Sequence, residues 1–327
     1  MAARDENPTE ERDAPQPQPE PREPRLGEPG PTDLSRRDYV AIVKRAVKES
    51  IADGITDSAA AIAYYGFTAI PALSLIAVGV FSLIAGQDAI NTVVDKVGTV
   101  APQEAVKLLE DSLDRTTQGG GGLTLILVGG AIAVWTATGT MTAVMRALNR
   151  AYGREESRKF LRQRLAALAM LVFMLLAFVL AFGLLVLGPK LSGWIGDAVG
   201  AETVVTWLWW VGQWPILVLA LLLAFGIVLY LGPNVEHPRW DFLSIGAVVA
   251  LVVWLAASGA FAFFVAHFGS YNKAWGALAG VVIMLTWLWV SALALLFGAE
   301  VNAEAERSRE LRKGEPAEVE LQAPPKS

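Results

Sequence analysis

Residues 165–188 read LAALAMLVFMLLAFVLAFGLLVLG, a run of 24 residues without a charged side chain. As a helix this run is about 36 Å long, which exceeds the roughly 30 Å hydrocarbon core of a bilayer. Peptide groups in that core find no water to bond, so a spanning segment must be helical. Five more uncharged runs occur, at residues 59–85, 123–145, 214–231, 242–266 and 277–298. The sequence therefore predicts an all-α integral membrane protein with six transmembrane helices.

The overall composition favours the same class. Hydrophobic residues make up 54% of the chain and charged residues only 18%, which argues against a soluble enzyme. The net charge of −5 is that of residues 1–33, with nine acidic and four basic side chains, so the remainder is neutral. A neutral body offers no general basic surface for nucleic acid, and we expect none as a partner.

The two ends of the chain differ from the apolar body. Residues 1–33 hold eight of the 17 prolines and are expected to be a disordered acidic tail. We expect a membrane domain at residues 34–306 and a second disordered tail at 307–327. Within the membrane domain, Ser35 and Asp38 have capping-box spacing before an apolar stripe with a cationic flank, which predicts a helix. This helix either lies on an anionic leaflet or packs on its own protein.

Loop charges predict the orientation, because Lys and Arg near span ends stay cytoplasmic. Seventeen Lys and Arg residues fall on one side, in residues 36–48, 146–164 and 307–313 and at Arg239, against five on the other side. An even number of spans with both termini cytoplasmic fits this asymmetry, and the expected location is the bacterial inner membrane. The first outer loop, residues 86–122, has helical apolar spacing and predicts two short helices. The outer segment at residues 194–214 carries Trp residues that favour the membrane interface.

Polar residues gather where the predicted spans reach the cytoplasmic boundary. They are Asp57, Arg146, Asn149, Glu300 and Asn302. Charges at that depth are usually paired, so we hypothesise that Arg146 and Glu300 form an ion pair that closes the inner mouth of a cavity. The alternative is that these side chains extend separately into the headgroups.

The first span combines hydroxyl groups with a helix breaker. Tyr64, Tyr65 and Thr68 precede Pro71, which removes one helical hydrogen bond and should kink the helix. These hydroxyls either bond across packed helices or line a cavity. Buried indole groups need polar partners, which we expect for the tryptophans near span centres: Trp135, Trp254, Trp287 and Trp289.

Catalytic constellations are missing from the sequence. Neither a GxSxG nor a GxxxxGK[ST] motif occurs, there is no cysteine, and His237 and His267 fall on opposite predicted membrane faces. Hence no enzymatic activity, cofactor or metal is expected. No ionisable residue lies in the middle of a predicted span, whereas ion-coupled carriers commonly use a midplane acid.

Several passages together resemble the YihY/BrkB family of bacterial inner-membrane proteins, once labelled ribonuclease BN. They are AIAYYGFTAIP at 61–71, ALNRAYGREESRKFLRQR at 147–164, YLGPN at 230–234, GAVVALVVW at 246–254 and YNKAWGALAGVVIMLTWLWVSALALLFGAEVNAE at 271–304. The resemblance implies a six-helix inner-membrane protein with links to envelope function, and a mistaken ribonuclease label. Ser244 and Ile245 stand where the family pattern suggests a Pro, and the Pro-rich start is a second departure.

The expected function is transport or handling of an amphiphile in the envelope membrane, with membrane lipids as partners. Hydroxyls, indoles and boundary charges suit an amphiphile better than a bare ion. One alternative is a scaffold that recruits partners through its basic inner loop and tails. Another is a hydrolase acting through Asp57, His237 and Glu300.

Overall fold

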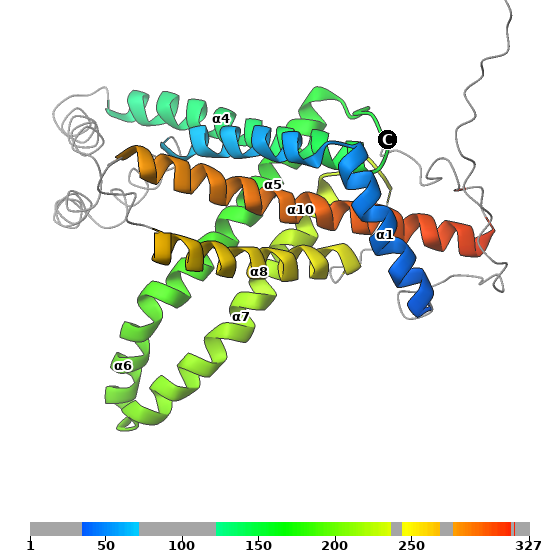
Figure 1. Ribbon diagram of the computed structural model, residues 1–327. Coiled ribbons are helices and arrows are strands. Elements are labelled where there is room, and N and C mark those ends of the chain that lie inside the picture. Colours follow the sequence, from blue (N-terminus) through cyan, green and yellow to red (C-terminus); the bar gives the residue numbers. More distant parts are fainter. Residues whose placement is uncertain (1–34, 72–121, 237–243, 269–276, 315–316, 318–327) are drawn as a thin grey trace, which may run out of the picture.

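A computed structural model of the chain describes residues 35–71, 122–236, 244–268, 277–314 and 317, and these are helical apart from short connections (Figure 1). No strand occurs among them, which confirms the all-α prediction. A helix at residues 55–71 follows α1 along the chain. The other elements are α1 (Arg36–Ala52), α4 (Gly122–Ala151), α5 (Phe160–Phe182), the π-helical η2 (Gly183–Leu187), α6 (Gly188–Val199), α7 (Glu202–Leu231), α8 (Ile245–Phe268) and α10 (Ala277–Lys313).

Four helical stretches in the described part of the chain are long and apolar enough to cross a membrane. They are Phe160–Leu185, Glu202–Leu231, Ile245–His267 and Leu278–Lys313, and they contain or overlap the predicted third to sixth spans. The predicted second span lies within the continuous helix α4. The end of the first span and the short helices predicted in the first outer loop lie outside the described residues, as does the 1–33 tail. A total of six spans and the orientation of the termini therefore stay predictions.

Helices α8 and α10 form the most extensive helix pair, because small residues let their backbones meet. A methyl group on Gly246 would collide with the carbonyl oxygen of Gly298, and one on Gly298 would collide with Ala250. Ala247 and Ala299 are fully buried beside this crossing. The crossing fixes the relative position of the two helices.

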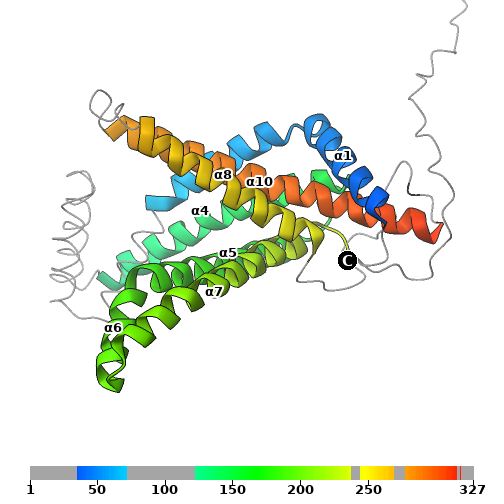
Figure 2. The same ribbon diagram turned by 60° about the horizontal axis from the view of Figure 1, so that its bottom comes forward.

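The main hydrophobic core lies at one end of the helices, which we call the packed end. Here α4 and α7 end, α5 and α8 begin, and α10 passes between them, so that Met145, Leu148, Met170, Leu229 and Leu296 are buried together. Away from the packed end the helices diverge (Figure 2). The diverging parts, which we call the splayed halves, expose large apolar side chains: Phe178, Val179, Leu219, Val252, Phe263, Phe264, Leu278 and Val282.

Helix α1 packs on the C-terminal part of α10. Ile42 and Ala46 are fully buried against Val301 and Ala305. Ion pairs between Arg45 Nε and Glu304 Oε2 and between Arg312 Nη2 and Asp38 Oδ2, both 2.6 Å long, hold the two helices together. The predicted capping box is confirmed, because Asp38 N donates to Ser35 Oγ and Ser35 N donates to Asp38 Oδ2.

This packing corrects one predicted boundary, whereas the position of α1 on a membrane leaflet stays a prediction. One face of α1 packs on its own protein, whereas its outer apolar stripe, which includes Val43 and Ile51, is exposed. Helix α10 continues to Lys313, so residue 307 is too early as the predicted start of the C-terminal tail. The reason is that Glu304 and Arg312 form ion pairs with α1, while Arg307 and Arg309 pair with Glu304 and Glu306 within α10.

The segment predicted as an outer connection, residues 194–214, is instead a helical hairpin. Helix α6 turns at Gly200, whose φ is +69°, directly into α7, and this left-handed conformation favours glycine. Trp207, Trp210 and Trp214 are exposed on α7 as expected for interface residues. The stretch Glu202–Leu231 is one continuous helix that contains Pro215.

Candidate functional site

The connection between α4 and α5 crosses the end of α7 at the packed end. Helix α4 stops at Ala151, and Gly153 then takes a left-handed φ of +58°, which turns the chain sharply. The turn is closed by Arg154 N, which donates to Asn149 O at 2.8 Å. Residues 155–158 are thereby placed beside the segment that follows α7.

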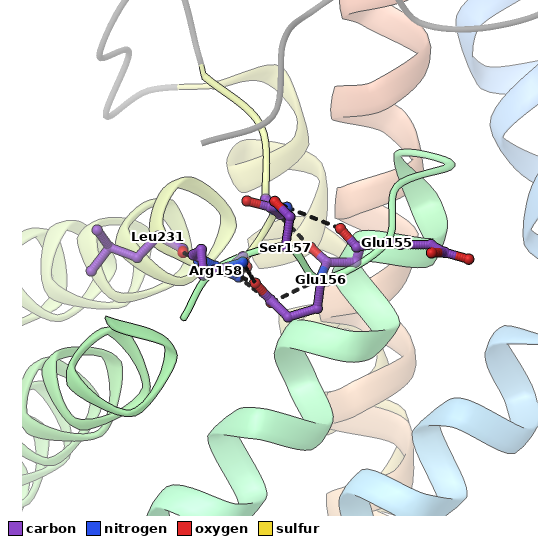
Figure 3. A network of polar contacts seen from close by, with 8 residues as sticks. Glu155, Glu156, Ser157, Arg158 and Leu231 are labelled. Atoms are coloured by element: carbon purple, nitrogen blue, oxygen red, sulfur yellow. Dashed lines mark hydrogen bonds and ion pairs between the residues drawn. The ribbon is translucent and has the colours of Figure 1, made fainter. Parts of the chain in front are cut away.

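Arg158 joins this connection to the end of α7 (Figure 3). Its side chain is only 2% exposed, and it binds Glu156 through Nε to Oε1 and through Nη2 to Oε2, both at 2.7 Å. The same guanidinium donates to Leu231 O at 3.0 Å and to Gly232 O at 2.8 Å. A cation at the carbonyl end of a helix also favours the helix dipole. Arg158 therefore bonds a partly buried carboxylate and two helix-end carbonyls at once.

Two asparagines extend the same network. Asn149 Nδ2 donates to Glu156 Oε2 at 3.0 Å, and its Oδ1 accepts from Asn234 N at 2.7 Å. Asn234 is fully buried, and its Nδ2 donates to Glu155 O and to Ser157 Oγ. The network thus ties α4, its connection to α5 and the segment after α7. We call Asn149, Glu156, Ser157, Arg158 and Asn234 the polar lock.

Electrostatics keep the carboxyl group of the polar lock ionised. Partial burial opposes ionisation of Glu156, but hydrogen bonds from Arg158 and Asn149 outweigh it and hold the pKa below its ordinary value. At neutral pH Glu156 is therefore negatively charged and faces the positive guanidinium of Arg158. The two charges thus compensate each other within the protein.

Asn302 also joins two helices at the packed end, because it bonds from α10 to the start of α8. Its Oδ1 accepts from Gly246 N at 2.7 Å, and its Nδ2 donates to Ser244 Oγ at 3.0 Å. Ser244 Oγ in turn accepts from Ala247 N at 3.1 Å, as an N-cap residue does. Ser244 thus starts α8 by capping it.

The other boundary residues do not assemble as expected. Arg146 and Asp57 are exposed, whereas Glu300 is 2% exposed and its Oε1 has no hydrogen-bond partner. Within the described residues the expected Arg146–Glu300 ion pair is not formed. Keeping the guanidinium of Arg146 exposed avoids its desolvation, which agrees with the alternative of separate side chains.

The hydroxyl residues of the first span lie on an accessible face of the described structure. Tyr64 and Tyr65 are exposed, with ring centroids 5.9 Å apart in an edge arrangement. Thr68 Oγ1 donates to Tyr65 O within the helix, and Pro71 is the last described residue of that helix. The predicted cavity beside them is not tested, because the rest of this span lies outside the described residues.

Two of the mid-span indoles have the polar partners that the sequence predicts. Trp254 Nε1 donates to Ser291 Oγ at 2.9 Å, and Trp289 Nε1 donates to Thr56 O at 3.1 Å. Trp254 also stacks edge-on against Trp287. Trp135 differs, because it is exposed and carries the guanidinium of Arg164 at 4.2 Å over its ring.

Sequence reasoning missed four members of the polar lock as site residues: Glu156, Ser157, Arg158 and Asn234. These residues lie in passages that carry the family resemblance, but the bonds that close the network, from Arg158 to Gly232 O and from Asn234 N to Asn149, join residues far apart in the chain. The available signal was an asparagine in a short Gly-Pro-Asn turn after a span. Among the described residues, no group of three His, Asp or Glu side chains is placed to hold a metal ion.

Comparison with known proteins identifies the family. The model of the family "Virulence factor BrkB" matches residues 46–322. This chain belongs to the BrkB family. The described helices and the polar lock lie largely within the matched region.

Several curated bacterial proteins are similar to parts of the chain. A "UPF0761 membrane protein" of Tolumonas auensis is 35% identical over 140 residues, which is 41% of this chain and 44% of that protein. A "Putative ribonuclease-like protein YfkH" of Bacillus subtilis is 28% identical over 128 residues, 39% of this chain and 46% of the relative. These matches span less than half the length of either relative. No solved structure matches the chain.

Proposed function

We propose that this BrkB-family membrane protein moves or holds amphiphiles, membrane lipids foremost, within the bacterial inner membrane and catalyses no reaction. The proposal rests on one observation, the contrast between a packed end closed by buried contacts and splayed halves that expose large apolar side chains. Apolar side chains in these positions can contact acyl chains between the helices as well as around them. In this proposal, six spans with both termini in the cytoplasm place the packed end on the cytoplasmic side.

Unpartnered hydroxyl groups offer sites for the polar part of such a ligand. Thr140 Oγ1 on α4 and Ser258 Oγ on α8 are buried atoms without a hydrogen-bond partner; Thr140 lies at the edge of the packed end and Ser258 lies beyond it. A buried hydroxyl without a partner is costly, so a ligand that bonds to it gains free energy. Charged ligands gain less there, because no ionisable residue lies mid-span.

The polar lock would then act as the barrier to complete passage. Opening the packed end requires Arg158 to leave the carbonyl oxygens of Leu231 and Gly232, which it bonds in the closed structure. These bonds join the α4–α5 connection to the end of α7, so their loss would separate the two. The lock is a positioning device in this proposal.

The experiment is movement of a fluorescent phospholipid between leaflets of liposomes that contain the purified protein. We expect faster movement than in protein-free liposomes. Thr140→Val should slow it about 2- to 12-fold, the equivalent of one hydrogen bond of about 0.5–1.5 kcal/mol. Thr136→Val is the matched control, because Thr136 Oγ1 already donates to Ile132 O. Folded, correctly oriented protein that moves no lipid would contradict the proposal.

The scaffold alternative finds less support at the basic connection, because several of its cations are engaged within the chain. Arg150 donates to Asp53 O and Ser58 Oγ, Arg158 is buried in the polar lock, and Arg164 lies over Trp135. Lys159 and Arg162 are exposed and remain available to a partner. Retention of all co-purifying proteins after mutation of these two residues would argue further against a scaffold.

Orientation has its own test, which the absence of cysteine makes clean. Single cysteines that replace Arg162 and Arg309 should both react with an impermeant thiol reagent only from the cytoplasmic side. Reaction of the two positions from opposite sides would overturn the proposed topology and the location of the packed end with it.

A further inference from the structure

A second feature, remote from the polar lock, lies in the hairpin of α6 and α7. A pocket of about 290 Å³ opens between the π-helical η2 and the first half of α7. Its apolar walls come from Leu184, Val205, Leu208 and Ile216. This volume is at the lower limit of pockets that hold small ligands, about 300–1,000 Å³. A π-helical turn such as η2 is itself frequent at functional sites.

Two polar atoms on the lining residues have no partner. Trp209 Nε1 is a donor and Gln213 Oε1 an acceptor, and both atoms are buried without a hydrogen bond. The residues are four apart on α7, so they lie on the same face of the helix. Elsewhere in the described bundle, Trp254 and Trp289 do find partners. Both residues line one apolar pocket, and a ligand there that supplies an acceptor and a donor would give these buried atoms the partners that they lack.

Backbone packing keeps the indole of Trp209 in place. A methyl group at Gly188 would collide with this ring, so only glycine lets α6 approach α7 so closely. Gly212, by contrast, lines the pocket and has nothing within 4 Å of where its Cβ would be. The space beside Gly212 is therefore open to a guest.

We propose that this pocket binds a lipid with a free hydroxyl group next to its acyl chain. One hydroxyl group can accept from Trp209 Nε1 and donate to Gln213 Oε1, since a hydroxyl is both donor and acceptor. The acyl chain then lies along the apolar wall formed by Leu184, Leu208 and Ile216. This inference extends the proposed function to a binding site away from the packed end, and it is measured without any transport.

The test uses the full chain in lipid nanodiscs with two photoactivatable probes, a long-chain alcohol and the alkane of equal length, each carrying a diazirine. Peptides are mapped by mass spectrometry after illumination. The alcohol should label the peptide around residues 205–216 several-fold more than the alkane does. Gln213→Leu should lower labelling by the alcohol about 2- to 12-fold and leave labelling by the alkane unchanged.

Gly212→Leu fills the pocket and should abolish labelling by the alcohol. The matched control is Gly259→Leu in α8, whose Cβ also meets nothing within 4 Å but which does not line the pocket. Unchanged labelling in Gly212→Leu, or equal labelling by alcohol and alkane in the wild-type protein, would overturn the inference. Either result leaves the transport experiment unaffected, so the two proposals fail separately.

Discussion

The packed end and the α6–α7 hairpin differ in how their polar groups are bonded, although buried atoms without a partner occur in both, with Asn234 Oδ1 and Glu300 Oε1 at the packed end. At the packed end Arg158, Asn149 and Asn234 bond to partners from different segments of the chain. In the hairpin Trp209 Nε1 and Gln213 Oε1 are buried without partners beside an open pocket. Satisfied polar groups stabilise one arrangement of helices, whereas open ones are available to a ligand. The long-range network assigns structural work to the first region, and the pocket beside the unpartnered atoms supports binding in the second.

Removal of Arg158 should have the largest effect. Arg158→Met leaves Glu156 charged and the carbonyls of Leu231 and Gly232 without their donor, so we expect a loss of about 3–5 kcal/mol in unfolding free energy. Unfolding in detergent, followed by circular dichroism, measures this loss. Arg162→Met, at an exposed position, should change stability by less than about 0.5 kcal/mol. Equal stability of the two variants would show that the polar lock does not hold the packed end.

The helix crossing at the packed end gives the next largest effect. Gly298→Ala forces a methyl group against Ala250 and should cost about 1–3 kcal/mol through overpacking. Gly280→Ala on the same helix meets open space and should be neutral or slightly stabilising. Thermal unfolding of both variants distinguishes the two regions of α10. A neutral Gly298→Ala would mean that α8 and α10 separate easily.

Acid should weaken the packed end through Glu156. The pKa of Glu156 in the folded protein lies below its ordinary value of 4.5. Its contribution to the unfolding free energy is therefore present above about pH 4.5 and is lost as the pH falls through the folded pKa. Unfolding midpoints measured between pH 7 and pH 3 should therefore fall more in the wild-type protein than in Glu156→Gln. Parallel curves for the two proteins would remove Glu156 as the source of acid sensitivity.

The smallest effect is expected at α1. Arg45→Met removes a partly exposed ion pair but leaves Glu304 its second partner, Arg307, at 2.8 Å. We expect about 1 kcal/mol or less, visible as faster hydrogen exchange in α1 rather than as global unfolding. Lys44→Met, at an exposed position on the same helix, is the control. Unchanged exchange would show that the Arg45–Glu304 ion pair does not hold α1 in place.

Periodic patterns in the sequence predicted the helices well, and the predictions that failed have a common cause. The capping box at Ser35 and Asp38 was readable because both residues lie within one helical turn. The extension of α10 to Lys313 was not, because Glu304 and Arg312 are stabilised by partners on α1, more than 250 positions away. The Arg146–Glu300 pair failed for the same reason, since similar depth in a membrane does not place two side chains face to face.

The sequence by itself determined that this is a helical membrane protein of the BrkB family. Long uncharged runs leave the backbone no hydrogen-bond partners in lipid except its own, so they must be helices. Only the tertiary structure decided which polar residues are engaged and which are open. Asn149 meets Asn234 across 85 positions, and Trp209 Nε1 meets no acceptor at all. Such contacts depend on how helices pack in three dimensions, and hydropathy does not encode them.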